Sequence, residues 1–124
     1  NEPELRSKLV DAKALLPIAD AGLSGELEIQ REVAAGLCNL TLEASARMEA
    51  ARCCLPAIVN LAQCGDREVA RQALGALANL AESPETHAHV AACGGSRCVV
   101  ALVEHTDVDV HREASRAIAN LLGT

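Results

Sequence analysis

The chain has 124 residues, half of them apolar, and a formal net charge of −6 at pH 7. This length suits one domain, and without Phe, Tyr or Trp its core must consist of Leu, Ile, Val, Ala, Cys and one Met. The acidic balance argues against general binding to the phosphate backbone of nucleic acids, and no run approaches the ~18 consecutive apolar residues of a membrane span.

Along the chain, the predicted elements come in groups of three helices. The first, short helix of each group is expected over 4–12, 44–51 and 84–92. The second, apolar helix is expected over 15–21, 55–62 and 98–104. In the third group, Ser83 is the expected N-cap and Pro84 the first helical residue. Gly94 and Gly95 then mark a bend where a positive φ is expected.

A long helix closes each group and ends near an Asn-Leu pair. The pairs are Asn39-Leu40, Asn79-Leu80 and Asn120-Leu121, at spacings of 40 and 41 residues. Counted from each Asn, apolar residues recur at −10, −6, −2 and +1, and such steps of three and four indicate a helix with one buried stripe. The stripe consists of Ile29, Val33, Leu37 and Leu40; Val69, Ala73, Leu77 and Leu80; and Val110, Ala114, Ile118 and Leu121. The sequence therefore contains an internal repeat.

Three helices in about 40 residues match the period of armadillo and HEAT repeats. The third group carries Ala-Ala-Cys-Gly-Gly at 91–95, Val-Val-Ala-Leu-Val at 99–103, Val-His-Arg-Glu-Ala at 110–114 and Ala-Ile-Ala-Asn-Leu at 117–121. These runs resemble the Ala-Gly-Gly, Leu-Val-x-Leu-Leu, Val-Gln-x-Glu-Ala and Ala-Leu-x-Asn-Leu pattern of the armadillo family. The second group departs from that pattern at the bend, where Arg52-Cys53 replaces the usual glycines, and the first is looser before Glu26.

The resemblance implies an all-α, right-handed α-solenoid of three armadillo repeats, each of three helices, in one domain. The repeats are expected at about 3–43, 44–82 and 83–124. Each repeat buries its apolar stripe only against a neighbour. Because no polar cap follows the third long helix, we expect either a piece of a longer array or a short array that covers its end by self-association as a homo-oligomer.

The resemblance also implies that the long helices line a concave groove in which each Asn binds the backbone of an extended peptide. At about 100° per residue, positions −11, −7, −4 and 0 share the face opposite the buried stripe, and position −8 flanks it. The candidate contacts of a peptide or protein partner are Asn39, Asn79, Asn120, Arg31, Arg71, Arg112, Arg116, Glu32, Gln72 and Glu113. Asn is a poor mid-helix residue, so three in register need a reason. Bracing of the neighbouring repeat is the alternative to peptide binding.

The charge of the partner stays open at this stage. Import adaptors of this family carry Trp at −4, where this chain has Ala35, Gly75 and Arg116, and this weakens the interpretation as a nuclear-import receptor for basic peptides. The acids at −11 and −7 suit a basic ligand, whereas the arginines suit an acidic one. Glu28, Glu68 and Asp109 at −11 also stand three residues before an arginine, so these charges fit solvated i,i+3 pairs as well.

Two other kinds of site are weaker candidates. His87, His89, Cys93 and Cys98 lie within twelve residues, but they lack the spaced cysteine pairs of structural zinc sites, so two exposed histidines and two core thiols are the favoured interpretation. The adjacent Cys53 and Cys54 could form a redox or metal-capture site, but adjacent cysteines form strained disulfides and the segment 50–55 fits helix packing equally well.

The sequence thus predicts a protein-binding scaffold without catalytic residues, cofactor or metal. Self-association through the solenoid ends is the alternative function. The six cysteines replace small apolar residues in helices, which favours reduced thiols and a cytoplasmic or nuclear location.

Overall fold

A computed structural model describes Leu23 and residues 25–123, and these residues are helical apart from turns. The helices are α3 (Leu27–Leu40), α4 (Ala44–Cys53), α5 (Leu55–Ala62), α6 (Arg67–Ala81), the 3-10 helix η1 (Pro84–Thr86), α7 (His87–Ala92), α8 (Gly95–Leu102) and α9 (Val108–Leu121). The helices expected over 4–12 and 15–21 lie outside the described residues. None of the described helices is long and apolar enough to cross a membrane.

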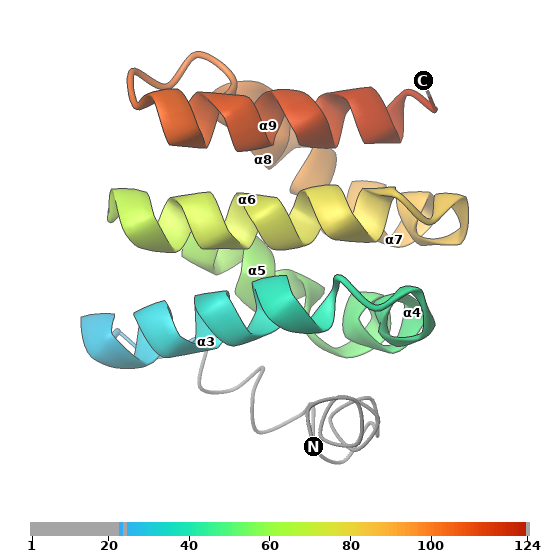
Figure 1. Cartoon of the computed structure of the whole chain (residues 1–124), viewed down its shortest axis with the longest axis horizontal. Coiled ribbons are helices and arrows are strands. Elements are labelled where there is room, and N and C mark those ends of the chain that lie inside the picture. The colour runs from blue at the N-terminus through green and yellow to red at the C-terminus, as the bar shows by residue number, and fades with distance from the viewer. Residues whose placement is uncertain (1–22, 24, 124) are drawn as a thin grey trace.

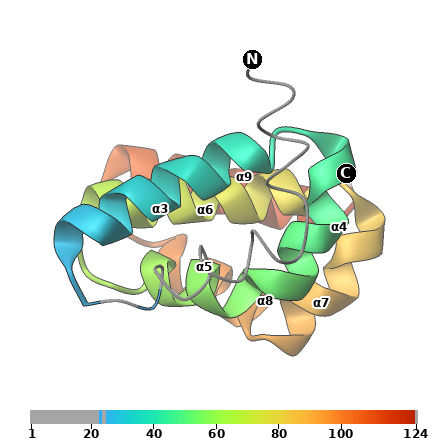
Figure 2. The same cartoon turned by 90° about the horizontal axis from the view of Figure 1, so that it is seen from below.

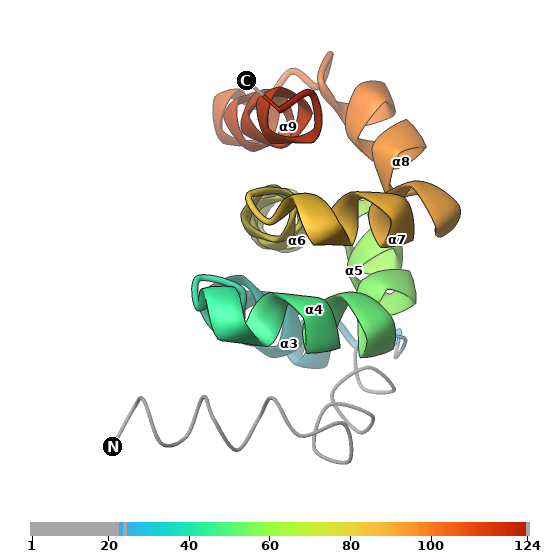
Figure 3. The same cartoon turned by 90° about the vertical axis from the view of Figure 1, so that its right-hand side faces the viewer.

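The helices form two layers. The long helices α3, α6 and α9 run in the same direction and lie side by side in one layer (Figure 1). The short helices α5 and α8 form the second layer, and α4 and α7 join the layers at one end (Figures 2 and 3). Successive groups of helices are therefore stacked, as expected for an α-solenoid.

The predicted stripe of the middle repeat is fully buried, because α6 has a long helix on each side. Val69, Ala73, Leu77 and Leu80 are at most 1% exposed. On α3 and α9, each with one long-helix neighbour among the described residues, two stripe residues are buried and two are half-buried. Half of the predicted stripe on these outer helices thus keeps some solvent contact. Side chains of α5 and α8, such as Ile58 and Val99, complete the core.

Helix boundaries follow the expected capping chemistry at several places. The carboxylate of Asp66 accepts a hydrogen bond from the Val69 N–H, and that of Asp107 accepts two, so these residues cap α6 and α9. Gly65 and Gly94 have φ values of 94° and 84°, which side chains disfavour, and each precedes the helix that follows a tight turn. The expected bend at Gly94 is confirmed.

Two local predictions are wrong. The helix expected over 84–92 is divided into η1 and α7. Its first turn is a 3-10 turn, in which the Thr86 hydroxyl donates to Leu80 O and Ser83 O. Ser83 stands at the N-cap position but makes no side-chain cap. The helix expected over 98–104 begins at Gly95 and ends at Leu102.

Candidate partner-binding face

The candidate residues lie on one side of the long-helix layer, which we call the long-helix face and define by positions −11, −8, −7, −4 and 0 of α3, α6 and α9. The solvent exposure of its residues differs between the three helices. On α3, Glu28, Glu32 and Asn39 are exposed, whereas on α6 Gly75 and Asn79 are buried. The face is therefore not opposite the core throughout, because α6 is enclosed between two other long helices.

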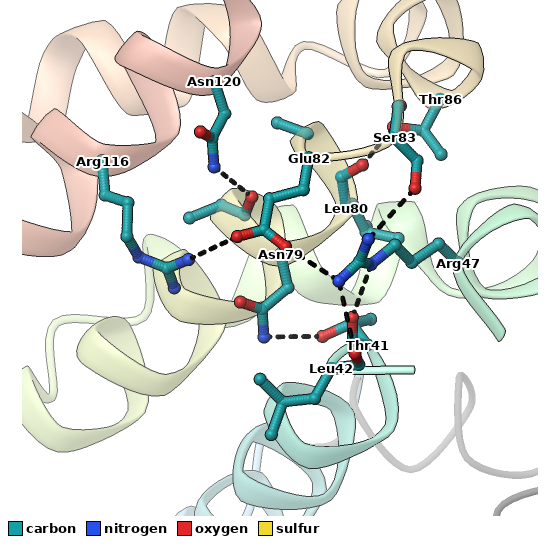
Figure 4. Close-up of polar contacts among 12 residues, drawn as sticks. Thr41, Leu42, Arg47, Asn79, Leu80, Glu82, Ser83, Thr86, Arg116 and Asn120 are labelled. Atoms are coloured by element: carbon teal, nitrogen blue, oxygen red, sulfur yellow. Dashed lines mark hydrogen bonds and ion pairs between the residues drawn. The ribbon is translucent and has the colours of Figure 1, made fainter. Parts of the chain in front are cut away.

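Two of the three asparagines brace the preceding repeat. The Asn79 Nδ2 donates to Cys38 O at 3.0 Å and to Thr41 Oγ1 at 3.2 Å, and the Asn120 Nδ2 donates to Ala78 O at 2.8 Å (Figure 4). Each amide thus reaches the carbonyl that immediately precedes the Asn one repeat earlier. The amide of Asn39 makes no such contact with the described residues. The geometry supports the bracing interpretation for Asn79 and Asn120.

The arginines at −8 all hold a carboxylate, but not in the same way. Arg71 pairs with Glu68 at 2.5 Å and Arg112 with Asp109 at 3.0 Å, as the i,i+3 spacing predicts. The corresponding pair on α3 was predicted between Arg31 and Glu28, and this is wrong. Arg31 instead contacts Asp66 at 3.2 Å, because that carboxylate stands at the start of the next long helix, where it also caps α6.

The −4 position of the middle repeat is closed by its neighbours. A Cβ added to Gly75 would lie 3.0 Å from both Cys38 Sγ and Glu113 Oε2, so side chains from α3 and α9 occupy this space. The Arg116 guanidinium donates to Gly75 O at 3.3 Å and pairs with Glu113 at 3.1 Å. An aromatic side chain at −4 would therefore displace both neighbours.

Arg47 of α4 joins the C-terminal ends of two long helices, and no sequence pattern predicted this role. Its guanidinium donates to Thr41 O at 2.8 Å and Leu42 O at 3.3 Å, after α3, and to Ser83 Oγ at 3.2 Å and Glu82 Oε2 at 2.9 Å, after α6 (Figure 4). Only 11% of the side chain is exposed. The Ser83 hydroxyl thus accepts a hydrogen bond from Arg47 and none from the N-terminus of η1.

Known proteins share both the repeat sequence and this arrangement of helices. Residues 46–82 match the family described as Armadillo/beta-catenin-like repeat. A designed armadillo repeat protein, solved in complex with the peptide (KR)4, is 26% identical with a TM-score of 0.86, and the match covers 94% of this chain and 50% of that one. Residues 46–82 thus carry an armadillo repeat, and the described residues share the armadillo-repeat solenoid fold.

Two engineered proteins are also similar to this chain in fold. One engineered protein is 28% identical with a TM-score of 0.89, over 97% of this chain and 50% of that one. A second is 31% identical with a TM-score of 0.86, over 94% of this chain and 29% of that one. The armadillo chain thus spans half the length of the first and less of the second. Among curated proteins, no match was found.

Hydrogen bonds and ion pairs lower the pKa of two acids at the start of α6, the N-cap Asp66 and Glu68 of the long-helix face. The Val69 N–H and then Arg31 lower the pKa of Asp66, and the hydrogen bond from Arg71 is the main cause of the lowered pKa of Glu68. The same contact raises the pKa of Arg71. Near neutral pH these groups are therefore charged and paired.

The cysteines and histidines of the armadillo chain do not converge on a site. All six cysteines are free, and burial raises the pKa of Cys54 to about 12 and that of Cys98 to about 11, which disfavours the reactive thiolate. The His87 Nε2 lies 2.7 Å from Ala81 O, and Cys93 Sγ donates to Val90 O. Over residues 25–123, no three His, Cys, Asp or Glu side chains gather as metal ligands.

Proposed function

We propose that this armadillo chain is a non-enzymatic scaffold that binds an extended segment of a partner protein in a concave groove along the long-helix face. The observation that carries the proposal is the parallel layer of α3, α6 and α9, which brings one helix position, occupied by Asn39, Asn79 and Asn120, into register three times. Repetition suits a ligand that is itself repetitive, such as an extended backbone, whereas an active site would be expected once. The similar designed armadillo protein in complex with a peptide supports the same mode.

Bracing and binding are compatible roles for the asparagines. A carboxamide has donors on its nitrogen and a separate acceptor oxygen. The contacts of Asn79 and Asn120 with the preceding repeat use only the nitrogen. The oxygen of the half-buried Asn120 stays available to accept a backbone N–H group of a partner, whereas Asn79 is only 2% exposed and acts mainly as a brace. The brace fixes the orientation of each amide in advance. Such pre-organisation lowers the cost of ordering a site on binding.

Asn39 offers the cleanest test, because its exposed amide has no described hydrogen bond and its loss should leave the fold intact. Peptides selected by display on the wild-type chain would be measured by fluorescence anisotropy against Asn39→Ala. We expect affinity to fall by about three- to tenfold, the range of one or two hydrogen bonds. Asn60→Ala, an exposed Asn of α5 in the other layer, is the matched control and should bind as wild type. Equal affinity of all three proteins would contradict the proposal.

Self-association is the second candidate function, favoured by large apolar side chains on the third repeat. Val100, Val108 and Leu122 are 61%, 68% and 73% exposed. Exposed apolar residues of this size often mark contact surfaces when they are contiguous. A mass that rises with concentration in light scattering, and returns to the monomer value in Leu122→Ser, would favour this function over the peptide groove.

A further inference from the structure

A cavity of about 110 Å³ lies at the junction of the second and third repeats, beside the start of α6. Ala62 and Ala70 line it from the second repeat, and Leu102 and His105 line it from the third. It lies at the edge of the solenoid where α6 and α9 begin, whereas α4 and α7 lie at the opposite edge (Figure 1). Its described lining includes none of the residues that define the long-helix face, so it is a separate candidate site.

The cavity is present because the second repeat has a small residue where the other two repeats have a larger polar one. Gln30, Ala70 and His111 all stand nine residues before the Asn of their repeat. Gln30 is only 9% exposed although it is polar, so its side chain is enclosed by the fold. The His111 ring contacts Val103 O, just after α8. The methyl group of Ala70 leaves the corresponding space in the second repeat open.

The contact of His111 indicates which chemical group suits the cavity. A carbonyl oxygen only accepts hydrogen bonds, so the His111 Nδ1 carries a proton and donates it to Val103 O. Val103 stands 41 residues after Ala62, and His111 stands 41 residues after Ala70, which is the spacing of these two repeats. The cavity between Ala62 and Ala70 is therefore the second-repeat counterpart of the space that the His111 ring occupies.

The volume and the charges of the cavity also suit a small neutral ring. An apolar cavity of about 150 Å³ accepts benzene, so 110 Å³ suits a five-membered ring. The two charged side chains of the lining already have partners. Asp66 pairs with Arg31 at 3.2 Å, and Arg67 pairs with Asp107 at 3.1 Å. A charged ligand would compete with these ion pairs, whereas a neutral ring leaves them intact.

We infer that this cavity binds a neutral imidazole group whose ring N–H donates to the Ala62 carbonyl oxygen. The same group is available from the histidine side chain of a polypeptide and from a free imidazole compound. Its binding is independent of the proposed peptide groove, because the two sites share no residue. A ring held there would contact Leu102 as well as Ala70, and would therefore stabilise the junction of the second and third repeats.

The test is an NMR titration of the wild-type chain at about pH 8, where imidazole is mostly neutral. The probes are free imidazole and the end-blocked tripeptide Gly-His-Gly. The amide resonances of Gly65, Ala70 and Leu102 should shift with a dissociation constant in the millimolar range, as expected for so small a group. N-methylimidazole has no ring N–H and should bind at least about fivefold more weakly, the loss of one hydrogen bond.

Two substitutions fill the cavity from within. Ala70→His copies the third repeat and should abolish the shifts at Gly65 and Leu102. Ala70→Gln copies the first repeat and should have the same effect, so it replaces the first variant if that chain does not fold. Ala88→His adds the same side chain at an exposed position of α7, at the other edge of the solenoid, and should bind imidazole as wild type does. Melting temperatures check that each variant is folded.

The outcomes separate the sources of the group and decide the inference. Tighter binding of the tripeptide assigns a histidine side chain, and binding of free imidazole alone assigns a small compound. The inference is overturned if neither probe gives a saturable shift, or if the folded cavity-filling variants bind as wild type does. Equal affinity for imidazole and N-methylimidazole would also overturn it, and this comparison needs no variant.

Discussion

The three asparagines share one register, yet their replacement by alanine should have three different effects on stability. Asn79 is 2% exposed and its nitrogen makes two hydrogen bonds, Asn120 makes one, and the Asn39 amide makes none with the described residues. Each bond contributes about 1 kcal/mol. Against this, alanine is the better residue inside a helix by ~0.5 kcal/mol. The balance between these two effects sets the sign.

The expected result is a graded series. Asn79→Ala should lower the free energy of unfolding by about 1.5 kcal/mol and Asn120→Ala by about 0.5 kcal/mol, whereas Asn39→Ala should raise it by up to about 0.5 kcal/mol. For a chain of this size the melting temperature should shift by about 4 °C per kcal/mol.

Urea unfolding followed by circular dichroism at 222 nm measures the series, and equal m-values would show that only stability has changed. The reasoning is refuted if Asn39→Ala destabilises as much as Asn79→Ala, or if Asn79→Ala is neutral. The first result would mean that the position in the repeat, and not the number of hydrogen bonds, sets the change in stability. The second would mean that the hydrogen bonds of the Asn79 amide make no net contribution to the free energy of unfolding.

Three further predictions follow from local contacts. Arg47→Ala should destabilise the chain by about 2 kcal/mol in thermal unfolding because it leaves two carbonyls and a carboxylate without their partner, whereas the exposed Arg52→Ala should cost under about 0.5 kcal/mol. Gly95→Ala places a Cβ 2.9 Å from a backbone oxygen and should cost about 2 kcal/mol, while Gly36→Ala, in open space within α3, should gain ~0.5–1 kcal/mol in the same assay. The folded-state pKa of Asp66 lies below its usual value, so its stabilising contribution is present above about pH 4 and is lost as the pH falls through the lowered pKa. Asp66→Asn keeps the capping oxygen and should make the urea midpoint decline less steeply in acid. An unchanged slope of the urea midpoint against pH would refute this assignment.

The fold could be predicted because helical periodicity is local and repeated. The residues at −10, −6, −2 and +1 of α6 are all buried, as the spacing indicates. What the pattern could not supply is the number of neighbours that each helix has. That number explains why Val69 is fully buried while Ile29, at the same position of α3, keeps some exposure.

The contacts of the candidate face were less predictable, since they depend on which of several partners is nearest in space. The i,i+3 rule correctly paired Arg71 with Glu68 but could not foresee that Asp66 would take Arg31 from across the repeat boundary. Arg47 is a stronger example. It stands in a polar stretch typical of a solvated helix, and its partners lie after α3 and after α6. Contacts that long side chains make between repeats leave no periodic pattern in the sequence.

Gly75 has a consequence for how the solenoid unfolds. Repeat proteins are usually treated as a one-dimensional chain in which each unit interacts only with the next. At Gly75 the absent side chain lets Cys38 Sγ of the first repeat and Glu113 of the third approach the same point on α6. Burial, and after it the negative charge of Glu113, raises the pKa of the Cys38 thiol. The outer repeats are thus coupled through the middle one. A description that counts only interactions between adjacent repeats leaves out this coupling. Unfolding of a three-repeat array should therefore be more cooperative than its interfaces between adjacent repeats imply.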